Sequence, residues 1–339
     1  MPYISEKRVE VSDEVTRKAL IVFETPKEFY NQARLMITNE ELVLLAAMGV
    51  ETRCLDELCS IVAEFGLADD AGGFIDNAWR RVIIDKIEDM EANAIKYKAA
   101  NFYNRFPVFA QYEPEIYSTV PKHIMDAMCD WEYEIYLGER RKNVLYKLKG
   151  LELDEKTHRI DFLTLDEAMQ VIDECETEIN VVPCDCKAMT YYHHKPTDGC
   201  INFGSDQFEI NSQRNRGYGR KLSKEEAKEL LRECGKAGLM HCGVSSGICN
   251  CDGPSCFNLR IAAELEARRV FPRAHYSIGY RRDKCTDCGI CTKICNFNAF
   301  SFTAYREVRF DPDKCYGCTI CADNCPENAI RLEKTSLGG

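Results

Sequence analysis

The sequence lacks three features that would place it in a common functional class. Its longest apolar run, Leu42 to Val50, is far shorter than the roughly 20 residues that a membrane helix needs. Charged residues interrupt the stretch from Met1 to Lys18, so nothing there resembles a targeting signal. No GxGxxG or Walker A sequence indicates a nucleotide-binding fold. We therefore expect a cytoplasmic protein without a membrane span.

The chain also lacks an excess of basic residues. It has 44 Lys and Arg against 55 Asp and Glu, which gives a net charge of −11. Bound metal clusters would make the charge more negative, because thiols that ligate metal lose their protons. This charge argues against nucleic acid or an anionic membrane as a partner of the whole surface. The length of 339 residues and the hydrophobic content of 45% are those of a globular protein with two or three domains.

Cysteine, in contrast, is abundant. Twenty cysteines in a cytoplasmic chain indicate metal or redox chemistry, because disulfides are rare in that compartment. Fifteen of them lie in two groups, in residues 184–256 and 285–325. The other five are scattered along the chain: Cys54, Cys59, Cys129, Cys175 and Cys234. Of these, Cys59, Cys175 and Cys234 occupy apolar helical positions, where we expect core packing.

The C-terminal group consists of two copies of one motif. The segments DKCTDCGICTKICNFNAF from Asp283 and DKCYGCTICADNCPENAI from Asp313 align at an offset of thirty residues. Such a repeat is expected when one structural unit is duplicated around two sites. Each copy has the spacing C-x2-C-x2-C-x3-C. Three thiolates in a tight loop can hold three corners of a [4Fe–4S] cubane, while the fourth reaches the neighbouring cluster.

This crossed pattern assigns four cysteines to each of two [4Fe–4S] clusters. We expect the first cluster to bind Cys285, Cys288, Cys291 and Cys325, and the second to bind Cys315, Cys318, Cys321 and Cys295. Gly289 and Gly317 suit a close approach of the backbone and N–H···S hydrogen bonds. Zinc is the alternative metal, but zinc sites usually combine two separated cysteine pairs rather than four cysteines within eleven residues.

The segment from about Lys284 to Leu332 is similar to bacterial-type two-cluster ferredoxins. The two cysteine motifs carry this resemblance, which implies a ferredoxin-like fold and electron transfer. One position departs from the family pattern. Cys325 precedes Pro326, as the pattern asks, whereas Cys295 precedes Asn296. We expect this departure to alter a turn and a local hydrogen bond without removing a ligand, so that the two clusters differ in potential.

The central group has seven cysteines, although one cubane needs only four thiolates. We expect a third [4Fe–4S] cluster whose ligands come from Cys184, Cys186, Cys249, Cys251 and Cys256, with Cys200 as a further candidate. The pattern leaves open which four bind. A leftover thiol, Cys242 included, could be catalytic, ligate a second cluster or be inert. A structural zinc site is the alternative, given two Cys-x-Cys pairs and nearby histidines: His193, His194 and His241.

Two helix signals accompany the central cysteines, one before the first of them and one within the group. The capping box Thr164-x-x-Glu167 predicts one helix, and the capping box Ser223-x-x-Glu226 predicts another. The chain as a whole also resembles a broad group of uncharacterised [4Fe–4S] proteins of anaerobes. The resembling pieces are RGYGR (Arg216–Arg220), GLMH (Gly238–His241) and ICNC (Ile248–Cys251). This resemblance implies electron transfer and names no substrate.

The N-terminal part predicts a helical module. A capping box at Thr38-x-x-Glu41 opens one helix, a short helix is expected over 56–65, and a longer one over 74–90. The aromatic segment 97–112 suits a strand pair or wing, so this outline resembles a winged helix. Basic residues of the third helix, Arg80, Arg81 and Lys86, would then contact DNA, and a protein-docking role is the alternative. A hairpin is expected near 151–162.

Together these patterns predict an α+β protein of three domains. Residues 1–150 would form a winged-helix-like docking module, residues 151–278 a cysteine-rich α/β iron–sulfur domain, and residues 279–339 a two-cluster ferredoxin domain. The expected function is electron transfer in an anaerobic redox system, with a partner oxidoreductase or carrier protein giving or taking low-potential electrons.

Two other functions are kept as alternatives. In the first, the chain is a reductase whose catalytic centre lies in residues 184–256. In the second, it is a redox-sensing winged-helix regulator. An electron-transfer component is favoured over an enzyme in its own right, and the chain is expected to work as an oligomer or as a subunit of a complex.

Overall fold

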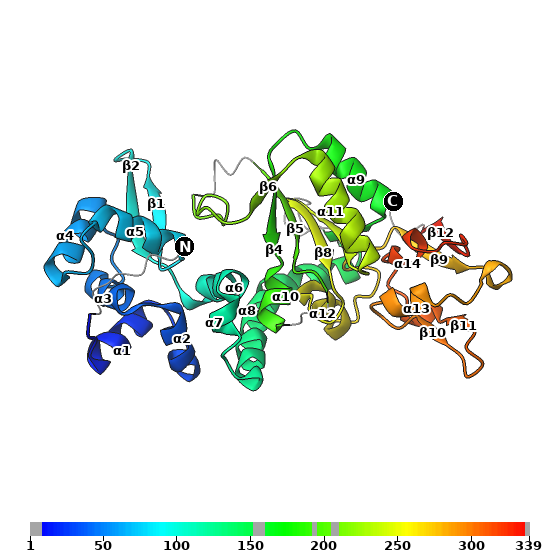
Figure 1. The fold of residues 1–339 in the computed structure, drawn as a ribbon, viewed down its shortest axis with the longest axis horizontal. Coiled ribbons are helices and arrows are strands. Elements are labelled where there is room, and N and C mark those ends of the chain that lie inside the picture. Colours follow the sequence, from blue (N-terminus) through cyan, green and yellow to red (C-terminus); the bar gives the residue numbers. More distant parts are fainter. Residues whose placement is uncertain (1–8, 152–159, 192–194, 205–209, 336–339) are drawn as a thin grey trace. The chain divides into compact units, whose positions relative to one another are not determined.

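The structure is a computed structural model, in which residues 9–151, 160–191, 195–204 and 210–335 are described (Figure 1). The chain divides into two compact units, Met1–Met128 with Asp206–Tyr218 and Cys129–Ser205 with Gly219–Gly339. Helices and strands are mixed along the chain, which confirms the predicted α+β class. The predicted division into three domains stays a prediction, and the expected hairpin near 151–162 lies mostly outside the described residues.

The first unit is mostly helical. Its elements are α1 (Asp13–Val22), η1 (Lys27–Phe29), α2 (Tyr30–Met36), α3 (Asn39–Met48), α4 (Leu55–Phe65), α5 (Ala71–Arg80), β1 (Ile84–Asp89), β2 (Ala94–Ala99), α6 (Phe102–Tyr112) and α7 (Pro114–Tyr117). The capping box at Thr38 is confirmed, because its side chain accepts from the N–H of Glu41 at 3.2 Å. Helices α3, α4 and α5 followed by the antiparallel hairpin β1–β2 match the winged-helix outline, which stays a prediction.

Two elements of this unit were misplaced by the sequence patterns. The third expected helix ends at Arg80, because Val82 adopts a φ of 61° that no α-helix contains, and the chain continues as β1. Tyr97 of the segment expected to form a strand pair or wing lies on strand β2, but most of that segment, Phe102–Tyr112, is helix α6. Its first turn is capped by Asn101, whose side chain accepts from the N–H of Asn104 at 2.9 Å.

Because the third helix is shorter than expected, the basic residues predicted for a DNA-contacting helix do not lie on one helix. Arg80 lies on α5, Arg81 follows its last residue, and Lys86 lies on β1. Arg81 is buried and pairs with Glu41 at 2.8 Å and with Glu113 at 3.2 Å. Both carboxylates hold the pKa of Arg81 above its usual value in spite of the opposing effect of burial. The Arg81 guanidinium therefore neutralises carboxylates within the first unit.

The second unit is built on a six-stranded antiparallel sheet with the order β3-β7-β8-β5-β4-β6. The strands are β3 (Ile160–Leu163), β4 (Ile179–Pro183), β5 (Asp198–Phe203), β6 (Arg220–Leu222), β7 (Met240–Val244) and β8 (Gly247–Cys251). The helices are α9 (Leu165–Glu174), α10 (Asp185–Thr190), α11 (Lys224–Lys236) and α12 (Phe257–Glu264), with α8 (Lys122–Leu148) contributing to both units.

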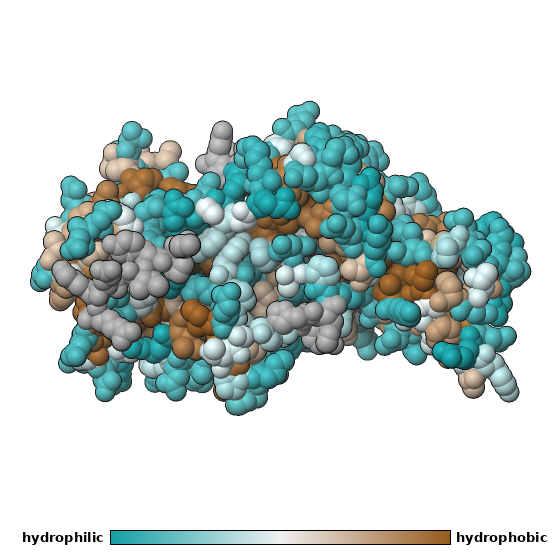
Figure 2. Space-filling model, viewed as in Figure 1, coloured by the Kyte–Doolittle hydropathy of each residue, from teal (hydrophilic) through white to brown (hydrophobic). Residues whose placement is uncertain are grey.

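Helices α9 and α11 lie side by side over one face of this sheet (Figure 1). The capping boxes that open them, at Thr164 and Ser223, are both confirmed. Ile172 and Leu231 pack from the helices onto Ile201 and Ile248 of the sheet. The outward side of both helices is hydrophilic (Figure 2), as expected for amphipathic helices that bury one stripe. The opposite face of the sheet is thereby left for other side chains.

The C-terminal part repeats one small unit. The strand pairs are β9 (Tyr276–Tyr280) with β12 (Ile330–Lys334) and β10 (Phe300–Phe302) with β11 (Val308–Phe310). The short helices are η2 (Arg282–Lys284), α13 (Ile290–Ile294), η3 (Pro312–Lys314) and α14 (Ile320–Asp323). The repeat extends to the backbone, because Asn298 and Asn328 both have positive φ, at 55° and 47°. In the described ranges, no helix is both long and apolar enough to cross a membrane.

Candidate metal centres

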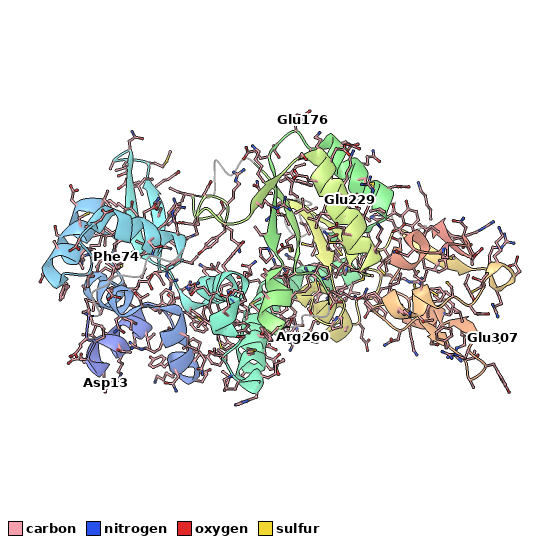
Figure 3. All side chains as sticks on the ribbon, viewed as in Figure 1. Asp13, Phe74, Glu176, Glu229, Arg260 and Glu307 are labelled. Carbon is pink, nitrogen blue, oxygen red and sulfur yellow. The ribbon has the colours of Figure 1, made fainter. Side chains whose placement is uncertain are left out.

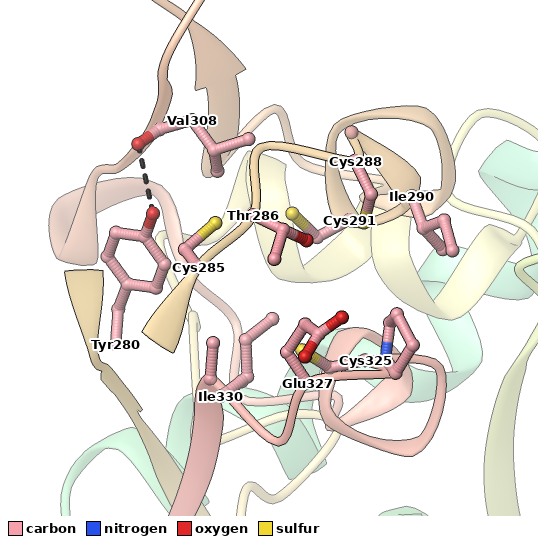
Figure 4. A pocket seen from close by; sticks show the side chains of 13 residues that line it. Tyr280, Cys285, Thr286, Cys288, Ile290, Cys291, Val308, Cys325, Glu327 and Ile330 are labelled. Atoms are coloured by element: carbon pink, nitrogen blue, oxygen red, sulfur yellow. Dashed lines mark hydrogen bonds between the residues drawn. The ribbon is translucent and has the colours of Figure 1, made fainter. Parts of the chain in front are cut away.

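One cavity of the C-terminal part is lined by cysteines from both copies of the repeat. Its thiols are those of Cys285, Cys288, Cys291 and Cys325. The cavity contains about 330 Å³ of empty space, and Figure 4 shows the side chains that surround it. The Tyr280 hydroxyl, on its wall, donates to the carbonyl of Val308 at 3.1 Å. The structure thus brings together the four residues expected to bind the first cluster.

A second cavity is lined by the other crossed set, Cys295, Cys315, Cys318 and Cys321. It contains about 290 Å³ of empty space. The rings of Phe297 and Tyr316 stack beside it, with centroids 3.9 Å apart. At the matching positions of the first cavity the repeat places Glu327 and Thr286, which are polar. The two cavities therefore share their cysteine pattern and differ in their walls.

Backbone N–H groups point at several of these sulfurs. Gly317 donates to Cys315 Sγ at 3.3 Å, as expected. In the first copy the donor to Cys285 Sγ is Asp287, at 3.4 Å, rather than Gly289. Both donors have positive φ, 57° for Asp287 and 74° for Gly317, so the two copies of the loop turn in the same way at matching positions. Such bonds would stabilise thiolates and tune the potential of a bound cluster.

The two cavities differ most in their exposure. The first reaches solvent at Cys288, which is exposed, whereas Cys318 of the second is only 8% exposed. Burial raises the pKa of Cys318 and of Cys321 well above the usual thiol value. Burial also raises the pKa of Cys291 to about 12. Thiols of this kind are held as thiolates when a metal binds, because metal coordination supplies the opposing charge.

In the central region, strand register places three cysteines in one row. Cys200 on β5 lies opposite Cys249 on β8, and Cys249 lies opposite Cys242 on β7. Because side chains alternate along a strand, Cys249 and Cys251 share a face, and Ile248 points to the other face under α9 and α11. The row of thiols therefore occupies the face that these two helices leave uncovered.

Contacts also join the four remaining central cysteines, Cys184, Cys186, Cys251 and Cys256, to this row. The Cys251 and Cys256 sulfurs are 3.6 Å apart. Hydrogen bonds from Cys186 and then Cys200 hold the pKa of Cys184 well below its usual value. Contacts with Cys184 and Cys249 raise the pKa of Cys200 well above it.

The cysteines of β7 and β8 belong to the same set of contacts. Hydrogen bonds with Cys242, Cys249 and Cys256 raise the pKa of the Cys251 thiol. All seven central cysteines thus form one connected set, which we call the central thiol cluster: Cys184, Cys186, Cys200, Cys242, Cys249, Cys251 and Cys256. The structure includes Cys242, which the sequence had left outside the candidate ligands.

A buried cation accompanies the central thiol cluster. Lys187 is 1% exposed, and its Nζ donates to the carbonyls of Pro196 at 2.6 Å and Asn250 at 3.3 Å. Within the described residues no carboxylate pairs with it. Its charge adds to the hydrogen bonds that lower the pKa of Cys184 and Cys249. A buried ammonium needs a counter-charge, so Lys187 fits an anionic thiolate-bound metal.

Acidic and aromatic side chains from α8 and α10 also lie near these thiols. Glu132 is buried, and its pKa is raised to about 9, mainly by burial and then by the charge of Asp185. Its Oε2 atom has no hydrogen-bond partner in the described part of the chain. Arg260, labelled in Figure 3, joins α12 to α8, because it pairs with Asp130 at 2.7 Å and lies over the ring of Tyr133. No sequence motif had indicated Glu132 or Lys187.

The histidines do not join the thiols in the described residues. His193 and His194 lie outside those residues. His241 precedes Cys242 on β7 and so points to the opposite face, where its Nδ1 lies 2.6 Å from Asn250 Oδ1. Its Nε2 is buried and has no hydrogen-bond partner in the described ranges, and burial lowers the pKa of His241.

Comparison with known families agrees with the C-terminal geometry. Residues 280–332 match the family model of the 4Fe–4S dicluster domain. The C-terminal part is therefore an iron–sulfur domain, which supports an electron-transfer role. Comparisons with the curated proteins and with the solved structures found no match.

Proposed function

We propose that this chain is an iron–sulfur electron-transfer protein. It would transfer low-potential electrons to or from a partner oxidoreductase or carrier protein of an anaerobic redox system. The observation that carries the proposal is the crossed arrangement of cysteines around two separate cavities. One [4Fe–4S] cluster would be held by Cys285, Cys288, Cys291 and Cys325, and the other by Cys315, Cys318, Cys321 and Cys295. Bound there, such clusters would supply reversible one-electron transfer.

The residues present fit these clusters. Each cavity has four thiols, and in each the backbone N–H groups at Asp287 or Gly317 are directed at a sulfur. The exposed Cys288 makes the first cavity the one that a partner can approach. Cys318 of the second cavity lies near Cys242 of the central region, whose charge adds to the effect of burial in raising the pKa of Cys318. We therefore propose that electrons pass between the first cavity, the second cavity and the central thiol cluster in that order.

The central thiol cluster is proposed to hold a third [4Fe–4S] cluster. Its ligands would come from Cys184, Cys186, Cys200, Cys249, Cys251 and Cys256, with zinc as the alternative metal. Seven connected thiols and the buried charge of Lys187 fit an anionic multinuclear centre. The first unit is proposed to dock the partner.

The first experiment is to measure iron, acid-labile sulfide and zinc on anaerobically purified protein, together with an EPR spectrum after dithionite reduction. About twelve irons per chain without zinc would support three clusters. About eight irons with one zinc would restrict electron transfer to the C-terminal part and give the central region a structural role. Fewer than about eight irons after reconstitution would contradict the proposed function.

A second candidate function is reduction of a substrate at the central thiol cluster. The observations that favour it are the surplus of thiols, seven where one cubane needs four, and the buried Glu132 Oε2, which has no hydrogen-bond partner among the described residues. A carboxyl group kept protonated by burial is suited to donating a proton in a reduction. Turnover by the isolated chain with a chemical reductant would establish this function. Electron transfer only to a protein acceptor would exclude it.

A further inference from the structure

The residue that departs from the ferredoxin pattern, Asn296, makes its contacts with the central region. Its Oδ1 accepts from the backbone N–H of Gly253 at 3.1 Å and from Lys195 Nζ at 2.9 Å. Its Nδ2 donates to the carbonyl of Gly238 at 2.9 Å. The proline that stands at the matching position of the other repeat, Pro326, has no side-chain group that could make any of these bonds.

One partner of Asn296, Gly253, belongs to a loop that carries central thiols. Gly253 lies between Cys251 and Cys256, two members of the central thiol cluster. Lys195 also pairs with the adjacent Asp252, at 2.7 Å, and that carboxylate is 3% exposed. One side chain therefore joins the residue after Cys295, which lines the second cavity, to the loop between two central thiols.

The packing around Asn296 is as close as a backbone allows. A Cβ atom on Gly253 would lie 2.8 Å from Asn296 Cβ and 3.0 Å from its carbonyl oxygen. A Cβ atom on Gly238, whose φ is 77°, would lie 3.0 Å from Ile294 Cβ. Two glycines of the central region thus allow it to approach the segment Ile294–Asn296 at backbone contact distance.

We propose that Asn296 is a positioning residue that fixes the central thiol cluster against the second ferredoxin-type cavity. This inference rests on the proposed function, since it concerns the separation of two redox sites. A proline at position 296 would complete the ferredoxin pattern and lose the contact with the central loop. The asparagine is explained as the residue that adapts one repeat of the dicluster domain to a neighbouring metal centre.

The test compares Asn296→Pro with the wild type. The substitution copies Cys325–Pro326, so the cysteine loop is expected to fold and keep its iron, while the side-chain bonds to Gly253, Lys195 and Gly238 are lost. Asn324→Ala is the matched control. Asn324 also donates across to the central region, to the carbonyl of Gly235 at 3.2 Å, but Gly235 belongs to α11 and not to a cysteine loop.

The primary readout is the spin–spin interaction between reduced clusters in the EPR spectrum, with the rate of intramolecular electron transfer after flash reduction as the second. We expect Asn296→Pro to weaken the interaction and to slow transfer, because the loss of the bonds to Gly253, Lys195 and Gly238 lets the two sites move apart. Asn324→Ala should leave both unchanged. Should Asn296→Pro lose iron, Gly253→Ala tests the same contact from the other side and should give the same result.

The outcomes separate this inference from the proposed function. A wild-type spectrum without interacting clusters, or zinc in the central site, would overturn both the third cluster and the role of Asn296. A wild type with three interacting clusters, and variants at Asn296 and Gly253 that retain their iron, interaction and rate, would overturn the positioning role alone. Equal effects of Asn296→Pro and Asn324→Ala would also overturn it, because general loosening of the interface would then explain the result.

Discussion

The crossed cysteine sets predict an unusual result for pairs of substitutions. Cys285 and Cys325 belong to different copies of the repeat but line the same cavity. Cys295 and Cys325 occupy matching positions of the two copies but line different cavities. Replacing both members of a pair by Ser should therefore give an effect that depends on the cavity and not on the repeat.

The size of the effect follows from the number of complete ligand sets that remain. The double variant Cys285→Ser, Cys325→Ser damages only one cavity, so about four of the domain's eight irons should remain. Its iron content should be no lower than that of the more damaging of the two single variants. Cys295→Ser with Cys325→Ser leaves neither cavity with four thiols. That double variant should lose or degrade both clusters of the domain.

The assay is iron and sulfide per chain with an EPR spectrum of the reduced protein, each compared with the wild type and the single variants. The control is Cys315→Ser with Cys325→Ser, two cysteines of one repeat. If each repeat held its own cluster, this control would keep one intact cluster. The crossed arrangement predicts that it keeps none, so an intact cluster in the control would refute the reasoning.

Three further predictions concern stability and are checked by urea midpoints under anaerobic conditions. Arg81→Met leaves the buried Glu41 unpaired and should cost the first unit about 3–5 kcal/mol; a loss under about 1 kcal/mol would contradict the buried pairing. Glu132 has a pKa raised from 4.5 to about 9, so the folded protein keeps a proton that the unfolded chain loses in this range. Stability should therefore fall as pH rises from 5 to 9 by on the order of 1 kcal/mol per unit, and Glu132→Gln should remove that slope. Thr164→Ala removes the cap of α9 and should cost about 1 kcal/mol, with Thr177→Ala, beyond the helix, as a near-neutral comparison.

The local parts of the fold could be predicted from the sequence because their causes are local. The capping boxes at Thr38, Thr164 and Ser223 each satisfy backbone N–H groups within one turn of the residue that signals them. Helix α6 could not be found in this way, since its aromatic residues suit a strand equally well. Its buried residues, Phe106 and Phe109, are fixed by packing within the first unit.

The site shows the same division between local and distant causes. The spacing of the C-terminal cysteines was sufficient to expect two crossed sets, and the structure places those sets around two cavities. The spacing of the central cysteines did not predict which of them meet, because the proximity of their thiols depends on which strands pair. Cys200 meets Cys249 only through the register of β5 and β8, and Cys242 joins them only through β7. The departure at Asn296 was visible in the sequence, but its partners were not.

Metal binding at the central thiol cluster, as proposed, would also link metal loading to correct folding, because the thiols form a row on one face of the sheet. On β8, Ile248 and Cys249 are neighbours that point to opposite faces. A slip of one residue in strand pairing would exchange them, placing sulfur beneath the apolar helices and an isoleucine where the thiols meet. Only the native register assembles the full set of ligands. Metal binding at this sheet would therefore stabilise correctly aligned strands relative to misaligned ones.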